Sequence, residues 1–120
     1  RVAFGKPLAN LGGNRERIAD ARIAIEQARL LVLRAAWKLD VGGPLNALSE
    51  VSQIKVAVPR MALEVIDFAM QIHGGGGLSD DHPLAGAWTN ARALRLADGP
   101  DEVHQGVVAR LELGKYGAKR

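Results

Sequence analysis

The residues best able to do chemistry lie in one short stretch, Ala97-Asp98-Gly99-Pro100-Asp101-Glu102. Asp98 falls where the apolar stripe of the preceding segment calls for a hydrophobic side chain, so we expect its carboxylate to face inward. A partly buried carboxylate has a raised pKa and can serve as a general base. Asp is also a favoured helix cap, and these residues alone leave both roles open.

Two helices are predicted to position this carboxylate. The segment 83–97 has apolar residues at helical spacing, namely Leu84, Ala87, Ala91 and Leu94. Gly99 permits a sharp change of direction, and Pro100 suits the first turn of a helix over about residues 100–115. Asp101 and Glu102 fall in that first turn, where negative charge meets the positive end of the helix dipole. The pattern therefore places Asp98 at a helix junction, beside a run of helical N–H groups.

Two longer helices are predicted upstream. The first begins at Asn14, which suits an N-cap, and runs to about Val41, where Gly42-Gly43-Pro44 stops it. Its apolar stripe is Ile18, Ala21, Ile25, Ala28, Val32, Ala35 and Leu39. The second runs from about Asn46 to His73 and is interrupted by Pro59. Its apolar seam is Val51, Ile54, Val58, Met61, Val65, Phe68 and Ile72, opposite a polar stripe of Glu50, Gln53, Arg60, Glu64, Asp67 and Gln71.

Tight turns between two long and two short helices predict one all-α domain over residues 1–120, an up-down four-helix bundle. The segment before Asn14 is expected to be irregular, and residues 118–120 to form a loose tail. Gly74-Gly75-Gly76-Gly77 ends the second long helix. These glycines allow two interpretations: a C-cap followed by a flexible turn, or close approach of the backbone to a ligand. A helix precedes them where a dinucleotide-binding fingerprint would have a strand.

The composition excludes several classes of function. The 120 residues include no cysteine, which excludes disulfides, thiolate catalysis and Cys-based zinc sites, and the three histidines are scattered. The 16 basic residues are interleaved with 13 acidic ones, and only 4% are aromatic, which argues against nucleic-acid binding. There is no apolar run of membrane-spanning length, and the first residues do not form a signal peptide. We expect a soluble intracellular domain: cytoplasmic in a bacterium, mitochondrial or peroxisomal in a eukaryote.

Three segments resemble the motifs of one family, in the right order and spacing. Arg1-Val2-Ala3-Phe4-Gly5-Lys6-Pro7-Leu8 is similar to the RxxFGKPL start of the C-terminal helical domain of acyl-CoA dehydrogenases. Gln71-Ile72-His73-Gly74-Gly75-Gly76-Gly77 resembles the family's Q-I-x-G-G-x-G segment. Residues 92–110 resemble its closing pattern, which ends in an A-R pair. The stretch from Ala97 to His104 most resembles the branch that contains acyl-CoA dehydrogenase family members ten and eleven.

This resemblance implies an FAD flavoenzyme that oxidises an acyl-CoA thioester to its trans-2-enoyl form. In the family a carboxylate removes the α-proton while a hydride passes to the flavin, and the matching position here is Asp98. Asp98 and Gly99 are thereby the candidates for substrate binding, with the Asp98 backbone N–H at the thioester carbonyl. The resemblance favours the base over the cap.

The resemblance also implies that FAD is bound across subunits of a homodimer or homotetramer. Arg1 and Phe4 match residues that touch the neighbour's cofactor. Further matches to the FAD site are Gln71, Ile72, His73, Gly74, Gly75, Pro100, Asp101 and Glu102. The chain departs from the family pattern where Pro100 replaces a Thr, Glu102 replaces a Gln and Leu11-Gly12 replaces a His-Gln pair. Asp98 is also one methylene shorter than the Glu of many members.

Most of a family enzyme lies outside these 120 residues, so we expect this chain to be the C-terminal domain of a larger enzyme and to be inactive in isolation. An electron-transfer flavoprotein is the expected electron acceptor. Two alternatives remain open: a flavin oxidase or monooxygenase of the same fold, and a non-enzymatic helical module for oligomerisation or interaction.

Overall fold

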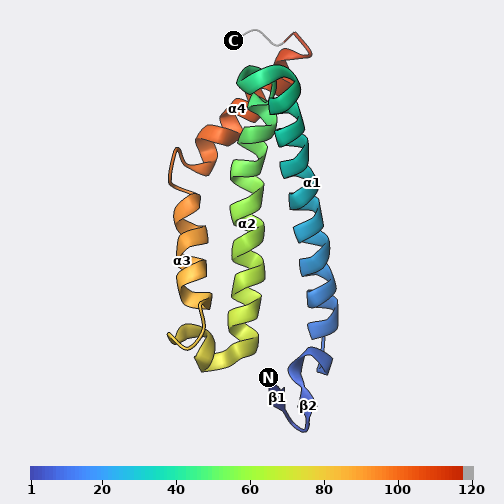
Figure 1. Cartoon of the computed structure of the whole chain (residues 1–120), viewed down its shortest axis with the longest axis vertical. Coiled ribbons are helices and arrows are strands. Elements are labelled where there is room, and N and C mark those ends of the chain that lie inside the picture. The colour runs from blue at the N-terminus through green and yellow to red at the C-terminus, as the bar shows by residue number, and fades with distance from the viewer. Residues whose placement is uncertain (118–120) are drawn as a thin grey trace.

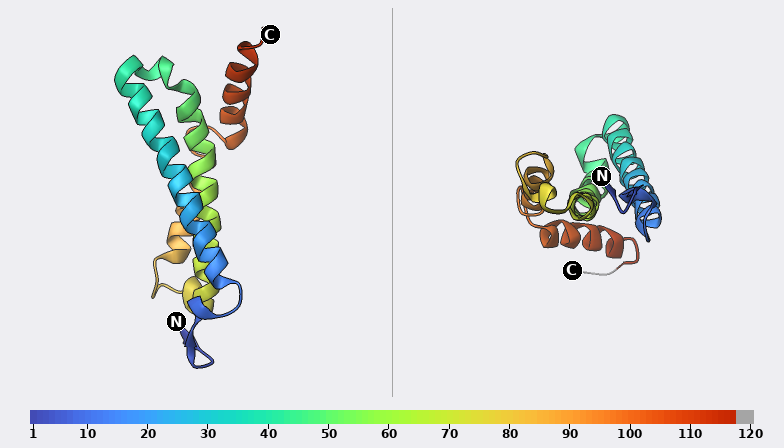
Figure 2. Two further views of the ribbon diagram at one scale, coloured as in Figure 1. Left: turned by 90° about the vertical axis from the view of Figure 1, so that its right-hand side faces the viewer. Right: turned by 90° about the horizontal axis from the view of Figure 1, so that it is seen from below.

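The chain is organised around one central helix. The computed structural model describes residues 1–117, in which four α-helices are present: α1 (Asn14–Asn46), α2 (Leu48–His73), α3 (Leu84–Leu94) and α4 (Asp101–Gly114). Helices α1, α3 and α4 each pack against α2 (Figures 1 and 2). The predicted four-helix bundle is confirmed. The predicted tail, residues 118–120, lies outside the described part of the chain.

The central helix is buried on two faces. Phe68 belongs to the predicted seam and is buried, with the guanidinium of Arg17 from α1 stacked 4.3 Å from its ring centroid. A second buried stripe, which the sequence analysis missed, consists of Ser52, Pro59 and Leu63. Because α2 has helices on more than one side, both stripes are covered. The helix continues through Pro59, whose burial offsets the lost backbone hydrogen bond.

The predicted polar stripe of α2 is wrong at Glu50. This carboxylate is 4% exposed and lies 3.2 Å from Arg34 Nε and 3.4 Å from Lys38 Nζ, both on α1. Burial alone would raise the pKa of Glu50, but hydrogen bonds from the backbone and Arg34 and the charge of Lys38 outweigh it, so the pKa is lowered. Glu50 therefore joins α2 to α1 and does not face solvent.

The ends of α1 differ from the prediction in detail. The helix continues to Asn46, but Gly43 has a φ of 70° inside it, so the chain does bend at the predicted Gly42-Gly43-Pro44 stop. Asn14 is the first helical residue and does not cap the helix, since the N-cap is Gly13. The Asn14 side-chain amide instead donates to the carbonyl oxygen of Leu8 at 2.7 Å and fixes the segment before the helix.

That N-terminal segment is more regular than predicted. Strands β1 (Val2–Ala3) and β2 (Lys6–Pro7) pair antiparallel, and a 3-10 helix, η1 (Leu8–Asn10), follows. The two residues between the strands, Phe4 and Gly5, have φ values of 53° and 74°, as in a type I′ hairpin turn. Phe4 is consequently held at the tip of a hairpin with its ring almost fully exposed.

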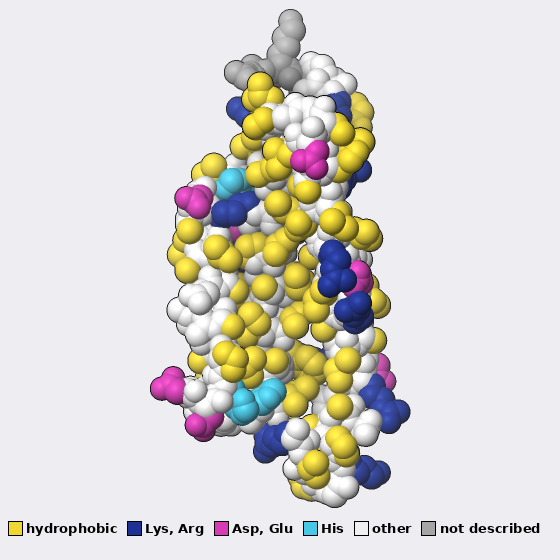
Figure 3. All heavy atoms as spheres, viewed as in Figure 1, with side chains coloured by type: hydrophobic (Ala, Val, Ile, Leu, Met, Phe, Trp, Pro, Cys, Tyr) yellow, Lys and Arg dark blue, Asp and Glu magenta, His cyan; other side chains and the backbone are white. Residues whose placement is uncertain are grey.

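The described residues enclose only a small apolar core: Ala28, Ala35, Ala47, Leu63, Phe68 and Ala91. The molecule is elongated, 61 × 27 × 25 Å, and hydrophobic side chains are visible all along the face in Figure 3. Within residues 1–117 no helix has both the length and the apolar character needed to cross a membrane.

Candidate functional site

The junction between α3 and α4 carries Asp98 on a tight turn. Helix α3 ends at Leu94 and α4 begins at Asp101. Asp98 has a φ of 52° and Gly99 a φ of 101°, so two consecutive residues adopt left-handed backbone and reverse the chain. The predicted sharp change of direction at Gly99 is confirmed.

One expectation for Asp98 is wrong, and one of its two alternative roles is excluded. Its side chain is exposed on this chain and does not face inward. Because α3 stops before the predicted end at Ala97, the apolar stripe does not extend as far as residue 98. Asp98 also does not cap α4, whose N-cap is Pro100 without a side-chain hydrogen bond. The cap interpretation is therefore excluded by geometry.

The buried carboxylate at the junction is that of Asp101, which is 2% exposed. Its Oδ2 accepts hydrogen bonds from Arg95 Nε at 2.8 Å and from Arg60 Nε, on α2, at 3.0 Å. Burial by itself would raise the pKa of Asp101, but the two arginines outweigh it and lower the pKa. The Asp101 side chain is thus engaged inside the molecule, while those of Pro100 and Glu102 are exposed.

Further bonds close the turn around Asp98. The Asp101 N–H donates to the Arg95 carbonyl oxygen at 3.2 Å. Lys55 Nζ, from α2, donates to the carbonyl oxygens of Leu94 at 2.5 Å and Gly99 at 3.3 Å. His104 Nε2 lies 3.2 Å from the Asp98 carbonyl oxygen. Within residues 1–117 the backbone N–H of Asp98 donates no hydrogen bond, so it is available to a ligand.

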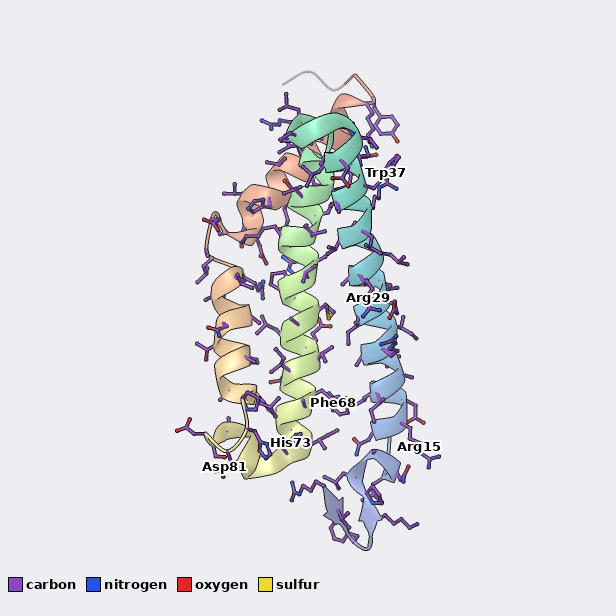
Figure 4. The ribbon with its side chains drawn as sticks, viewed as in Figure 1. Arg15, Arg29, Trp37, Phe68, His73 and Asp81 are labelled. Carbon is purple, nitrogen blue, oxygen red and sulfur yellow. The ribbon has the colours of Figure 1, made fainter. Side chains whose placement is uncertain are left out.

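A second group of predicted site residues lies at the far end of α2. The guanidinium of Arg1 donates to the Ile72 carbonyl oxygen at 3.3 Å. The first residue of the Arg1–Leu8 segment therefore contacts the start of the Gln71–Gly77 segment. His73 ends α2, as Figure 4 shows, and its Nδ1 lies 2.7 Å from the Ala69 carbonyl oxygen. The ring of His82 packs edge-on against it, with centroids 4.8 Å apart. The arrangement brings Arg1 and His73 to the start of the glycine run.

The four glycines form a 3-10 helix, η2 (Gly74–Leu78), not a flexible turn. Gly74 is the predicted C-cap, with a φ of 62°, and a Cβ there would lie 2.5 Å from Arg1 Nη1. At Gly77 a Cβ would lie 2.6 Å from the Met70 carbonyl oxygen, so packing requires this glycine. Gly75 is exposed and has no atom within 4 Å of such a Cβ, which leaves its backbone open to close approach.

The structure does not bring the two groups of residues together on one chain. Lys55, beside the Asp98 turn, and Ile72, beside Arg1, are both on α2, and the intervening helix is about 25 Å long at 1.5 Å per residue. One chain therefore presents two separate sites at a fixed spacing.

The family model for the acyl-CoA dehydrogenase C-terminal domain matches residues 1–113. The chain belongs to the acyl-CoA dehydrogenase family. It is 56% identical over 113 residues to mouse acyl-CoA dehydrogenase family member 10, covering 94% of this chain and 11% of that protein. A Mycobacterium abscessus protein assigned as an acyl-CoA dehydrogenase has 78% identity and a TM-score of 0.94, covering 97% of this chain and 28% of the other.

The FAD complex of PigA is also similar, with a TM-score of 0.85 and 28% identity, covering 95% of this chain and 29% of PigA. The chain thus spans about a tenth to three tenths of the length of these relatives. It is the C-terminal domain of an acyl-CoA dehydrogenase family protein, and the resemblance to family members ten and eleven is confirmed.

For an acyl-CoA dehydrogenase domain, the end of α2 has the features needed to contact a dinucleotide. Arg1 supplies positive charge next to the open backbone of Gly75, and exposed Phe4 extends beyond the chain's own surface. The Asp98 end fits less completely, because the Asp101 carboxylate is held by two arginines and Glu102 would bring negative charge toward phosphates.

Sequence reasoning missed four residues of the junction: Lys55, Arg60, Arg95 and His104. Arg60 and Asp101 are 41 positions apart, so no local spacing reports their ion pair. Arg95 is only six positions before Asp101, so this nearby basic residue was the available signal.

Proposed function

We propose that the full-length protein is an FAD-dependent acyl-CoA dehydrogenase in which Asp98 removes the substrate's α-proton. The observation that carries this proposal is the geometry of the turn. An exposed carboxylate stands on a left-handed residue held by bonds on both sides, at the position that matches the family's base. Strained backbone held in this way is typical of functional sites.

The residues of the turn can divide the work of α-proton removal. The Asp98 carboxylate accepts the proton, while the free Asp98 N–H donates to the thioester carbonyl oxygen and stabilises the negative charge that develops there. The neighbouring Gly99 leaves room for the thioester. Bound FAD supplies the acceptor for the β-hydride. Exposure of Asp98 on this chain requires that other parts of the enzyme exclude water from the site.

The residues proposed to hold FAD are those of the α2 end: Arg1, Phe4, Gln71, Ile72, His73, Gly74 and Gly75. Pro100, Asp101 and Glu102 are proposed to lie near the dinucleotide at the other site, where Asp101 contributes by fixing α4 because its carboxylate is already paired. The cofactor is proposed to be shared between subunits of a homodimer or homotetramer.

The remaining parts of the proposal concern the whole enzyme. The substrate is an acyl-CoA, the electron acceptor is an electron-transfer flavoprotein, and the domains that enclose the flavin ring lie outside this chain. The 120-residue domain alone is accordingly expected to be inactive. A flavin oxidase or monooxygenase of this fold would differ in those outside domains.

The test is Asp98→Asn in the full-length enzyme. Asn suits a left-handed position and has the same shape, but it cannot accept a proton at neutral pH, so FAD content and oligomeric state should persist. Turnover should fall by about two to four orders of magnitude, the usual contribution of a positioned general base. Asp98→Glu restores the carboxylate and should be milder. A folded, FAD-loaded Asp98→Asn enzyme with full activity would remove the assignment.

A further inference from the structure

We propose that Lys55 is a positioning residue that fixes Asp98 for proton removal; this inference rests on the proposed role of Asp98. Lys55 comes from the central helix α2, and the turn it contacts lies 39 to 44 positions later in the sequence. No sequence motif marks it, and within residues 1–117 no hydrogen bond joins its side chain to the proposed cofactor residues of the α2 end.

The contacts of Lys55 bracket Asp98. Its Nζ donates to the carbonyl oxygen of Leu94, the last residue of α3, and to that of Gly99, the residue directly after Asp98. The ammonium group therefore joins the beginning and the end of the turn in which Asp98 and Gly99 have left-handed backbone. Asp98 is bonded directly to Gly99, so a displacement of Gly99 would move the Asp98 carboxylate and, one peptide further back, its free N–H.

The chemistry of Lys suits this task. The Leu94 carbonyl lies in the last turn of α3, at the negative end of the helix dipole, and within residues 1–117 it accepts no backbone hydrogen bond. A positively charged donor is favourable there. Lys55 lines an apolar hollow with Val58, Pro59 and Leu94, so its stem can pack on hydrophobic surface while its Nζ reaches the carbonyls.

A second link from α2 holds the other side of the junction. Arg60 binds Asp101, which is also bound by Arg95, and this cluster fixes the start of α4. The cluster orients a helix, whereas Lys55 bonds directly to the carbonyl oxygen of Gly99, the residue after Asp98. Lys55 is therefore the side chain whose loss should displace the base with the least effect on the bundle.

The experiment uses the full-length FAD-loaded enzyme. Lys55→Met keeps the stem and removes the donor, and Lys115→Met makes the same change at an exposed lysine at the end of α4. Flavin reduction is followed by rapid mixing with saturating acyl-CoA. We expect Lys55→Met to lower the reduction rate by about ten-fold or more, since small misplacements of catalytic groups have effects of this size. FAD content and oligomeric state should match those of Lys115→Met, which should reduce at the wild-type rate.

A double variant separates positioning from a general structural role. If Lys55 acts through Asp98, Lys55→Met should cause no further loss in the Asp98→Asn background. An equal loss in both backgrounds, or a full reduction rate in FAD-loaded Lys55→Met, would overturn the inference.

If Lys55→Met does not fold, Lys55→Gln retains a shorter neutral donor, and its flavin reduction rate should be about three-fold lower than that of the wild type. A wild-type rate in Lys55→Gln would overturn the inference equally. Full activity of Asp98→Asn alone would instead refute the proposed base.

Discussion

Asp98 occupies a backbone conformation that most residues avoid. At a φ of 52°, the Cβ of an L-residue crowds the following carbonyl, which costs about 1–2 kcal/mol, and Asn and Asp are the side chains that tolerate it best. The residue type at position 98 is therefore restricted by the turn as well as by any chemistry. This restriction can be measured separately from activity.

We expect Asp98→Val to destabilise the protein by about 1–2 kcal/mol, because a β-branched side chain is disfavoured at positive φ. Asp98→Asn, by contrast, should have a thermal midpoint close to that of the wild type. Differential scanning calorimetry of both variants at neutral pH checks this. Equal midpoints for the Val and Asn variants would show that the turn does not keep its left-handed geometry in solution.

The sequence predicted the junction but placed its inward-facing carboxylate at Asp98, whereas the buried one is that of Asp101. Extrapolating the α3 stripe by one more turn placed Asp98 inside, whereas the helix ends at Leu94 and the chain turns over. Asp101 was assigned to the first turn of α4 correctly, yet its burial depends on Arg60 and Arg95, which come from other segments. Periodicity reports a helix face only as far as the helix continues.

At the level of elements, the Asp101 cluster connects the end of α3, the start of α4 and the middle of α2. Both arginines are partly exposed, so solvent screens them and the cluster stabilises less than a fully buried pair would. The lowered pKa of Asp101 means that the folded state prefers the ionised carboxylate. Its stabilisation is present above the ordinary value of 3.8 and is lost as the pH falls through the lower, folded-state pKa.

We expect Asp101→Asn to reduce the free energy of unfolding by about 1–3 kcal/mol at neutral pH. The difference from wild type should stay constant at near-neutral pH and shrink below about pH 4, where Asp101 in the unfolded wild-type chain is protonated. Urea unfolding at several pH values and fixed protein concentration measures both effects. Glu102→Gln, an exposed acid in the same helical turn, is the matched control and should change stability by at most about 0.5 kcal/mol. A pH-independent loss in Asp101→Asn would contradict the ionic role.

The presence of four helices was predictable because their apolar patterns are long and because strong helix-breaking residues stand at their ends. The stops at Gly43 and Gly74 both have positive φ, as glycine allows. The hairpin at Val2–Ala3 and Lys6–Pro7 was not predicted, because two-residue strands carry no readable alternation. The burial of Glu50 was missed for the same reason as that of Asp101: its partners are on another helix.

At the level of the whole molecule, the chain does not close its own core. Its radius of gyration is 18.1 Å, against about 14 Å for a compact chain of this length. Its accessible surface is 8271 Å², against about 6,300 Å² for a folded monomer of this mass. The excess, about 2,000 Å², is of the size that stable subunit or domain interfaces bury.

Helix α1 shows where part of this surface lies. Besides its face toward α2, it has an outer stripe of exposed apolar side chains: Ile23, Leu30, Leu33, Trp37 and Val41. Trp37 points away from α2 in Figure 4 and is 61% exposed. A helix that is apolar on opposite faces is characteristic of one buried on both sides. The outer stripe is therefore expected to be covered in the assembled protein.

We expect the 120-residue chain, purified alone, to self-associate at concentrations on the order of tens of micromolar, since the outer stripe then has no other protein surface to cover it. Size-exclusion chromatography with light scattering gives the mass.

The double variant Leu30→Lys/Trp37→Lys places two charges seven residues apart on the outer stripe and should shift the mass toward that of one chain. Ala36→Lys/Asn90→Lys adds the same charge at exposed positions off the stripe and should leave the mass unchanged. A wild-type chain that remains monomeric would contradict coverage of the stripe by a second copy. Association that persists in the Leu30→Lys/Trp37→Lys variant would place the contact on another face.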